Sequence, residues 1–353
     1  MGKVQIRSQY INININIHNT NKDNDDDYND NVNDNHMYIN NDPSLYTTIG
    51  SLSSRDFPVS PSLTHLVLDG SVTSLQTLKF GTLFNQPITP GCLPSSITSL
   101  KFGDRFNKAL SLEAFPSSLT SLEIGTSFDH SLEGVLPSSL RTLVLLTGHC
   151  ELRPTTLPRS LTSLMVGPTF MQFLVKDVLP PTLISLTFDR DFNMPLLADV
   201  LPSSLTHLTL GLHFGSELVL PPSVTHLTIG YFSQFKYVQS TVRMVEISYV
   251  IGVHQLNNYP IPKLPVTRLD TLLLHGKCLD DGDLRESATF AKDVAKTIPK
   301  VSTICIELDA RKSSSSTIIR TIFDSDSCQT VGAWCVTSGK PKTYMRGYYL
   351  KLT

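Results

Sequence analysis

The chain has 353 residues, which suggests about two domains and leaves room for a sizeable core. Its formal net charge is −2 and only 17% of its residues are charged, so its composition gives no sign of a protein that binds nucleic acid or a membrane surface through charge. No run of apolar residues approaches the ~20 that a helix needs to cross a bilayer, which excludes a transmembrane helix.

The first element in the chain is a polar tail over residues 1–42, which holds 12 of the 17 Asn residues together with 7 Asp. Asn and Asp offer little apolar surface to offset the entropy lost on ordering, so we predict a disordered Asn/Asp-rich tail. Within it, residues 10–17 alternate Ile with Asn and have the period of a strand, which could pair with a sheet edge or promote aggregation.

The first residues of the sequence and its six cysteines indicate the cellular compartment in which we expect the protein. The first residues contain no continuous apolar stretch of the kind found in secretory signals. The nearest two cysteines, Cys328 and Cys335, are too far apart for the two-residue spacing of zinc and redox sites. We therefore expect a cytoplasmic protein with free thiols and without a bound metal or cofactor.

The middle of the chain repeats one pattern about every 22 residues. One copy is Leu93-Pro94-Ser95-Ser96-Ile97-Thr98-Ser99-Leu100-Lys101-Phe102-Gly103, and a second half-pattern of the type Phe106-Asn107-Lys108-Ala109-Leu110 follows it. The prolines recur at positions 94, 116, 137, 158, 180, 202 and 221, with spacings of 22, 21, 21, 22, 22 and 19. Weaker copies flank them over residues 59–68, 72–80, 242–247, 269–274 and 301–306.

This pattern has a direct physical interpretation. The apolar residues of Leu-x-x-Leu-x-Leu/Phe point inward, the last two at strand period, while Pro belongs in a corner because it lacks a backbone N–H. A single unit cannot bury its apolar side alone, whereas stacked units share a continuous core. The sequence therefore predicts a mainly β protein in which residues 43–275 form a solenoid of ~22-residue units.

The repeat resembles the FNIP repeat, a family related in shape to leucine-rich repeats. The resemblance is strongest over residues 80–103 and covers about 59–235 well and 236–306 poorly. It implies a leucine-rich-repeat-like solenoid whose role is interaction. The copy over residues 140–150 departs from the pattern, since Leu146-Thr147-Gly148-His149-Cys150 stands where Gly and Phe are expected.

From about residue 276 the pattern changes, and we predict a small α+β cap over 276–353 that covers the last apolar layer. Residues 283–298 have a helical apolar spacing after a capping sequence, and residues 317–323 also suggest a helix. Residues 301–308, 331–336 and 344–352 suggest strands. This segment carries a mild excess of positive charge, typical of a solvated surface.

The residues that flank the inward Leu positions form the candidate protein-binding face of the solenoid. Lys101 and Glu123 occupy the same slot of successive repeats and should lie side by side, and so should His207 and His226. Two stacked histidines could bind a metal, but a variable polar slot is the simpler explanation, so we assign no metal site. The predicted face consists of His65, Val67, Thr77, Lys79, Ser99, Lys101, Ser121, Glu123, Thr142, Val144, Ser163, Met165, Ser185, Thr187, His207, Thr209, His226 and Thr228.

Two functions are compatible with these observations. The first is a non-catalytic repeat scaffold that binds a protein partner, but not nucleic acid or membrane, through this face, which is rich in Ser and Thr and sparsely charged. The alternative is an enzyme or ligand-binding module that uses the C-terminal segment or a groove between cap and solenoid. No Gly-x-Ser-x-Gly elbow and no phosphate-binding loop occurs, so the sequence predicts no catalytic residue and favours the scaffold.

Overall fold

The computed structural model describes the backbone of residues 2–8, 11–17, 36–41, 59–60, 76–251, 269–277, 301–312, 315–324 and 329–338. Side chains are described for residues 76–248, 269–275 and 301–302. The chain divides into two compact units, Met1–Thr182 and Leu183–Thr353, and each is described by itself. No helix among these described residues is long and apolar enough to cross a membrane.

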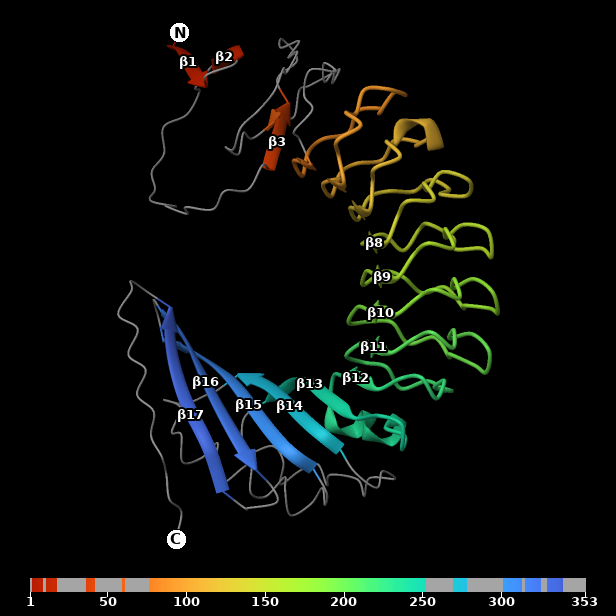
Figure 1. Cartoon of the computed structure of the whole chain (residues 1–353), viewed down its shortest axis with the longest axis vertical. Helices are drawn as coiled ribbons and strands as arrows, with labels where there is room; N and C mark the ends of the chain where they lie inside the picture. Colours follow the sequence, from red (N-terminus) through yellow and green to blue (C-terminus); the bar gives the residue numbers. More distant parts are fainter. Residues whose placement is uncertain are drawn as a thin grey trace. The chain divides into compact units, whose positions relative to one another are not determined.

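Unit 1 contains a ladder of short parallel strands that follow one another in chain order (Figure 1). The ladder consists of β5 (Thr77–Phe80), β6 (Ser99–Lys101), β7 (Ser121–Ile124), β8 (Thr142–Leu145) and β9 (Ser163–Val166). Strand β3 (His36–Asn41) pairs in parallel with β5 and with β4 (Val59–Ser60). An antiparallel hairpin is formed by β1 (Gly2–Ser8) and β2 (Ile11–Ile17), and one 3-10 turn, η1, spans Leu112–Ala114.

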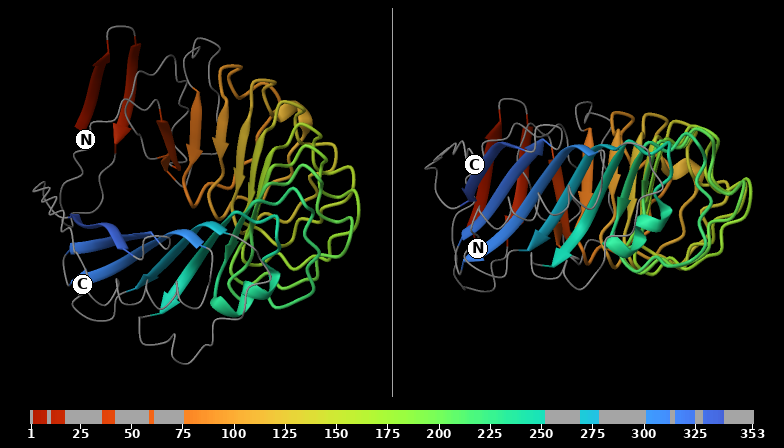
Figure 2. Two further views of the ribbon diagram at one scale, coloured as in Figure 1. Left: turned by 60° about the horizontal axis from the view of Figure 1, so that its bottom comes forward. Right: turned by 90° about the horizontal axis from the view of Figure 1, so that it is seen from below.

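Unit 2 continues the same construction and then changes strand direction. Its parallel strands are β10 (Ser185–Phe188), β11 (His207–Thr209), β12 (His226–Ile229), β13 (Met244–Ile251), β14 (Leu269–Lys277) and β15 (Val301–Lys312). Strands β16 (Ser315–Asp324) and β17 (Gln329–Ser338) add to β15 in antiparallel order, so β14 to β17 run side by side (Figure 2). A 3-10 helix, η2, spans Phe232–Tyr237.

Each coil of the solenoid turns at three corners, and the repeat pattern explains all three. At the Leu-Pro corner the proline carbonyl accepts a hydrogen bond from the residue three positions on, as Pro116 O does from Leu119 N–H at 3.0 Å. After the strand, Gly103 O accepts from Phe106 N–H at 3.2 Å, and a Cβ on Gly103 would collide with the backbone of Gly81 one coil earlier. Glycine is needed there because successive coils approach closely.

In four of the described coils the third corner uses a residue in the left-handed region. Its third position is occupied by Gly91, Gly134, Asp177 and Asp199, with φ between 65° and 78°. The hydrogen bond from Val135 N–H to Leu132 O, 3.1 Å long, closes one of these corners and matches a type II turn, which requires positive φ at that position. Gly adopts this conformation freely and Asp tolerates it better than most residues do.

The inward Leu positions stack from strand to strand and form the core of each unit. In unit 1, Leu100, Leu122, Leu143 and Leu164 pair in register and are at most 1% exposed. In unit 2 the ladder runs in register through Leu186, Leu208, Leu227, Val245 and Leu272, all buried. These ladders confirm the mainly β solenoid and its ~22-residue repeat, because residues one repeat apart occupy adjacent strands.

Aromatic rings fill the middle of the coil beside the Leu ladder. Phe84, Phe106 and Phe128 stack with ring centroids 6.0 Å apart between neighbours. The divergent copy after β8 places Cys150 and Thr147 in the interior instead, and Thr147 Oγ1 donates to Phe128 O at 2.6 Å. Strand β8 nevertheless pairs in register with both of its neighbours, so this copy is a regular member of the stack.

Three further expectations can be compared with the structure. The helix predicted over residues 317–323 is wrong, because these residues lie in β16; its Thr and Ile side chains are β-branched and favour a strand. The strands predicted over 301–308 and 331–336 are confirmed as parts of β15 and β17. Parallel pairing also extends beyond residue 275, through β14 to β15.

Other expectations lie outside the described residues. The helix predicted over 283–298 and the strand predicted over 344–352 both fall on residues that the structure does not describe. In the tail, the strand character of residues 10–17 agrees with β2, and residues 36–41 form β3. Residues 18–35 are not described, so their disorder stays a prediction, as do the domain boundaries at 42 and 275.

Candidate interaction face

Two side chains of every strand in the ladder point away from the core, one on each side of the inward Leu. We call the position before this Leu the first slot and the position after it the second slot. Together these positions form what we call the sheet face. In unit 1 the sheet face consists of Thr77, Ser99, Ser121, Thr142 and Ser163 in the first slot and Lys79, Lys101, Glu123, Val144 and Met165 in the second.

In unit 2 the same two slots continue over β10 to β14. The first slot holds Ser185, His207, His226, Met244 and Thr271, and the second holds Thr187, Thr209, Thr228, Glu246 and Leu273. The structure therefore places sixteen of the eighteen predicted face residues on the sheet face of their own unit, whereas His65 and Val67 lie outside the described residues.

The side chains of the sheet face are partly exposed and spaced by the strands. Neighbouring strands lie ~4.8 Å apart, so each slot becomes a row of closely spaced groups. A threonine beside the face extends the hydrogen bonding between coils, as Thr120 Oγ1 donates to Thr98 O at 3.1 Å. Because the ladder fixes the backbone of every rung, the hydroxyl groups of the face are held in a defined pattern.

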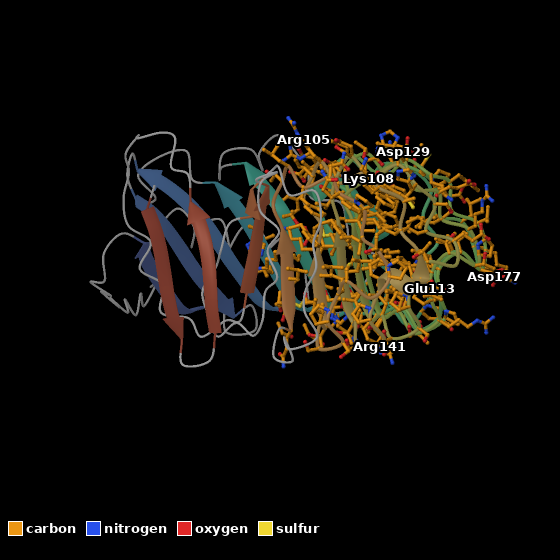
Figure 3. The ribbon with its side chains drawn as sticks, turned by 90° about the horizontal axis from the view of Figure 1, so that it is seen from above. Arg105, Lys108, Glu113, Asp129, Arg141 and Asp177 are labelled. Atoms are coloured by element: carbon orange, nitrogen blue, oxygen red, sulfur yellow. The ribbon has the colours of Figure 1, made fainter. Side chains whose placement is uncertain are left out.

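Charge is sparse on the face and concentrated at the corners of unit 1. The face holds the ion pair between Lys101 Nζ and Glu123 Oε1 at 2.7 Å, which confirms that these two residues lie side by side. Figure 3 shows Arg105 and Asp129 along one edge of the coil and Arg141 along the opposite edge. Charged groups at the corners keep the coil solvated while the face between them stays mainly neutral.

Unit 2 carries an imidazole pair and a carboxylate–imidazole pair on its face. The rings of His207 and His226 stack with centroids 4.2 Å apart and an interplanar angle of 14°. Partial burial and the neighbouring His207 lower the pKa of His226 below its ordinary value. His275 Nε2 lies 3.1 Å from Glu246 Oε1, and this hydrogen bond holds the pKa of the Glu246 carboxyl below its usual range.

The sequence interpretation ended the face too early. Met244, Glu246, Thr271 and Leu273 occupy the same slots on β13 and β14. The signal was available, because residues 242–247 and 269–274 keep the apolar spacing of the repeat. Neither copy has Pro three positions before its first apolar residue or Gly directly after its last, as the copy over 93–103 has, so they do not stand out although their register is that of the regular copies.

The chemistry that the described face can perform is recognition by hydrogen bonds and a few charges. Among the described side chains, no three His, Cys, Asp or Glu residues converge to hold a metal ion. The thiols of Cys92 and Cys150 are buried, and burial raises the pKa of both, to about 11 for Cys150. These two thiols are therefore core groups without the exposed thiolate that a nucleophile needs.

Comparison with known proteins shows which family and which solved structure the chain is similar to. The FNIP Repeat family matches the chain over residues 51–105, 84–127, 106–146, 151–191, 174–213 and 192–232, which together make up about half of it. No curated protein matches the chain. A crystal structure of CroV588, described as a novel circular LRR protein, is similar at 29% identity with a TM-score of 0.48. The similarity covers 66% of this chain and 36% of that one.

Proposed function

This chain belongs to the FNIP repeat family, and from that premise we propose that it is a non-catalytic scaffold that binds a protein partner through its sheet face. The proposal rests on one observation above all. The two slots of unit 1 run in register over five parallel strands, so ten partly exposed side chains form one continuous surface. A surface held rigid by its backbone loses little entropy when it binds.

The composition of this surface favours protein over other partners. Ser and Thr fill the first slot of unit 1, while the second slot adds Val144, Met165 and the Lys101–Glu123 pair. Hydroxyl groups next to apolar side chains and a few charges suit a protein interface. A nucleic-acid interface would need an excess of Lys and Arg on the same face, and the described face has Lys79 and Lys101 as its only cations of that kind.

The test compares bulky substitutions on the face with matched substitutions away from it. The face variant carries Ser121→Arg and Ser163→Arg, which lie in the first slot of β7 and β9. The control carries Ser111→Arg and Ser138→Arg, whose side chains are exposed outside the strands. Both variants add the same charge and volume. Full-length chains are cross-linked to their interactors in cells and the captured proteins are quantified.

We expect the face variant to lose the interactors that the wild type and the control retain, with an unchanged melting temperature. If the face variant retains every interactor, the sheet face is not the binding surface. That result would leave the C-terminal segment 276–353 as the alternative, whose side chains are described at Val301 and Ser302 alone.

A further inference from the structure

Three side chains with metal-binding atoms meet in the first slot of unit 2. His207 of β11 pairs in register with His226 of β12, and His226 pairs in register with Met244 of β13. All three residues are partly or fully exposed, and their inward neighbours Leu208, Leu227 and Val245 are buried. Two imidazoles and one thioether therefore form a row on one face, across three adjacent strands ~4.8 Å apart.

Hydrogen bonds around Thr206 are compatible with the metal-binding tautomer of the first imidazole. Thr206 Oγ1 lies 3.3 Å from Ile184 O and 2.7 Å from His207 Nδ1. A hydroxyl has one proton, so when Thr206 donates it to the Ile184 carbonyl, its oxygen accepts from the Nδ1–H of His207. The lone pair of His207 then resides on Nε2. Metal-binding histidines are usually held in this way, with the other ring nitrogen donating a hydrogen bond.

The second imidazole also contacts the threonine that precedes it, and its lone pair lies on Nε2 when Thr225 Oγ1 accepts from its Nδ1–H. His226 Nδ1 lies 2.9 Å from Thr225 Oγ1, and the two rings are nearly parallel, with centroids 4.2 Å apart. Both Nε2 atoms are thus directed away from their threonines and lie on the same side of the stack. Two nitrogens that bind one ion at ~2 Å are roughly 3.5 Å apart, but the in-plane lone pairs of nearly parallel rings do not converge. The exposed His207 ring must therefore rotate out of the stack for both Nε2 atoms to reach one ion.

We propose that His207, His226 and Met244 form a copper(I) site, with the two Nε2 atoms and the Met244 Sδ as ligands. Thioether sulfur favours Cu(I), whereas imidazole by itself also suits zinc, nickel and iron. The nearest carboxylate on this face, Glu246, accepts hydrogen bonds from His275 and Thr228, so the row itself offers nitrogen and sulfur rather than oxygen. This inference goes beyond the scaffold function and needs no protein partner.

The test uses the full-length chain without a histidine tag. Accessible thiols are first blocked with N-ethylmaleimide, because cysteine also binds Cu(I). Cu(I) is then titrated without oxygen against bicinchoninate, and Zn²⁺ is titrated separately. The variants are His226→Gln and Met244→Leu, and His149→Gln removes another exposed histidine as the matched control. The methyl signal of Met244, assigned from the Met244→Leu spectrum, reports on the sulfur directly.

We expect the wild type and His149→Gln to bind one Cu(I) per chain and to shift the Met244 methyl signal. The Cu(I) affinity should fall at least about tenfold in His226→Gln. Met244→Leu should weaken Cu(I) to a similar degree but leave Zn²⁺ binding within about twofold. If His226→Gln is folded and binds Cu(I) as tightly as the wild type, the proposal is overturned. If Met244→Leu leaves Cu(I) binding unchanged, the assignment of Met244 and the preference for Cu(I) are wrong.

Discussion

Lys101 and Glu123 lie 22 positions apart in the sequence, yet Lys101 Nζ is 2.7 Å from Glu123 Oε1 because their strands β6 and β7 pair in register. The side chains are 46% and 27% exposed, so solvent screens their attraction. The pair thus reports the register of the solenoid more than it stabilises the fold. Because the two side chains lie on adjacent strands, substitutions at this pair test whether β6 and β7 keep this register.

Replacing Lys101 with Ala should therefore lower the free energy of unfolding by only about 0–1 kcal/mol. Lys101→Glu should destabilise further, since it places two carboxylates directly opposite each other. Adding Glu123→Lys to Lys101→Glu restores an opposite pair and should restore the wild-type midpoint in urea. A double variant as unstable as Lys101→Glu alone would show that the two side chains do not interact in solution.

Leu122 should be far more sensitive than its neighbours on the face. It is fully buried between Leu100 and Leu143, so Leu122→Ala leaves a cavity and should cost about 2–5 kcal/mol. Urea unfolding followed by circular dichroism measures the loss. Ser121→Ala on the same strand serves as the control and should change stability by less than about 0.5 kcal/mol, because Ser121 is partly exposed. Equal midpoints for the two variants would place Leu122 outside the core.

Two glycines separate the effect of backbone conformation from that of crowding. A Cβ at Gly134 meets nothing within 4 Å, but φ is +70° there, so Gly134→Ala should destabilise the chain by about 1–2 kcal/mol. Gly215 also has room, with His213 O nearest at 3.9 Å, and its φ lies outside the left-handed region. Gly215→Ala should stabilise by about 0.4–1 kcal/mol, because alanine restricts the unfolded chain. Thermal unfolding checks both signs, and a stabilising Gly134→Ala would contradict the corner geometry.

Cys150 should react slowly with alkylating reagents in the folded chain. Burial raises its pKa to about 11, so little thiolate is present at pH 8. The alkylation rate should increase about tenfold per pH unit until the pH approaches that value, because only the thiolate reacts. Iodoacetamide labelling followed by peptide mass spectrometry measures the rate. The unfolded chain, in which the thiol regains an ordinary pKa, is the reference. Equal rates for the folded and unfolded chain would show that Cys150 is accessible.

The sequence alone was sufficient for the repeating part of the fold. Seven regularly spaced prolines and the Leu spacing located the corners, the inward ladder and the face slots, and therefore also the neighbours Lys101 and Glu123. This success has a physical reason. In a solenoid each unit contacts mainly the next one, so a residue's surroundings follow from the position one repeat away. Even the divergent copy around Cys150 keeps its place, since the neighbours on both sides impose the register.

Only the tertiary structure decided the features that depend on particular neighbours. Residues 317–323 have an apolar pattern that fits a short helix or a strand, and pairing with β15 and β17 makes them a strand. The hydrogen bonds of Thr206 and Thr225 that orient His207 and His226 likewise depend on side-chain geometry that spacing does not contain. Periodicity determines which residues share a row, whereas the contacts within that row depend on the packing of individual side chains.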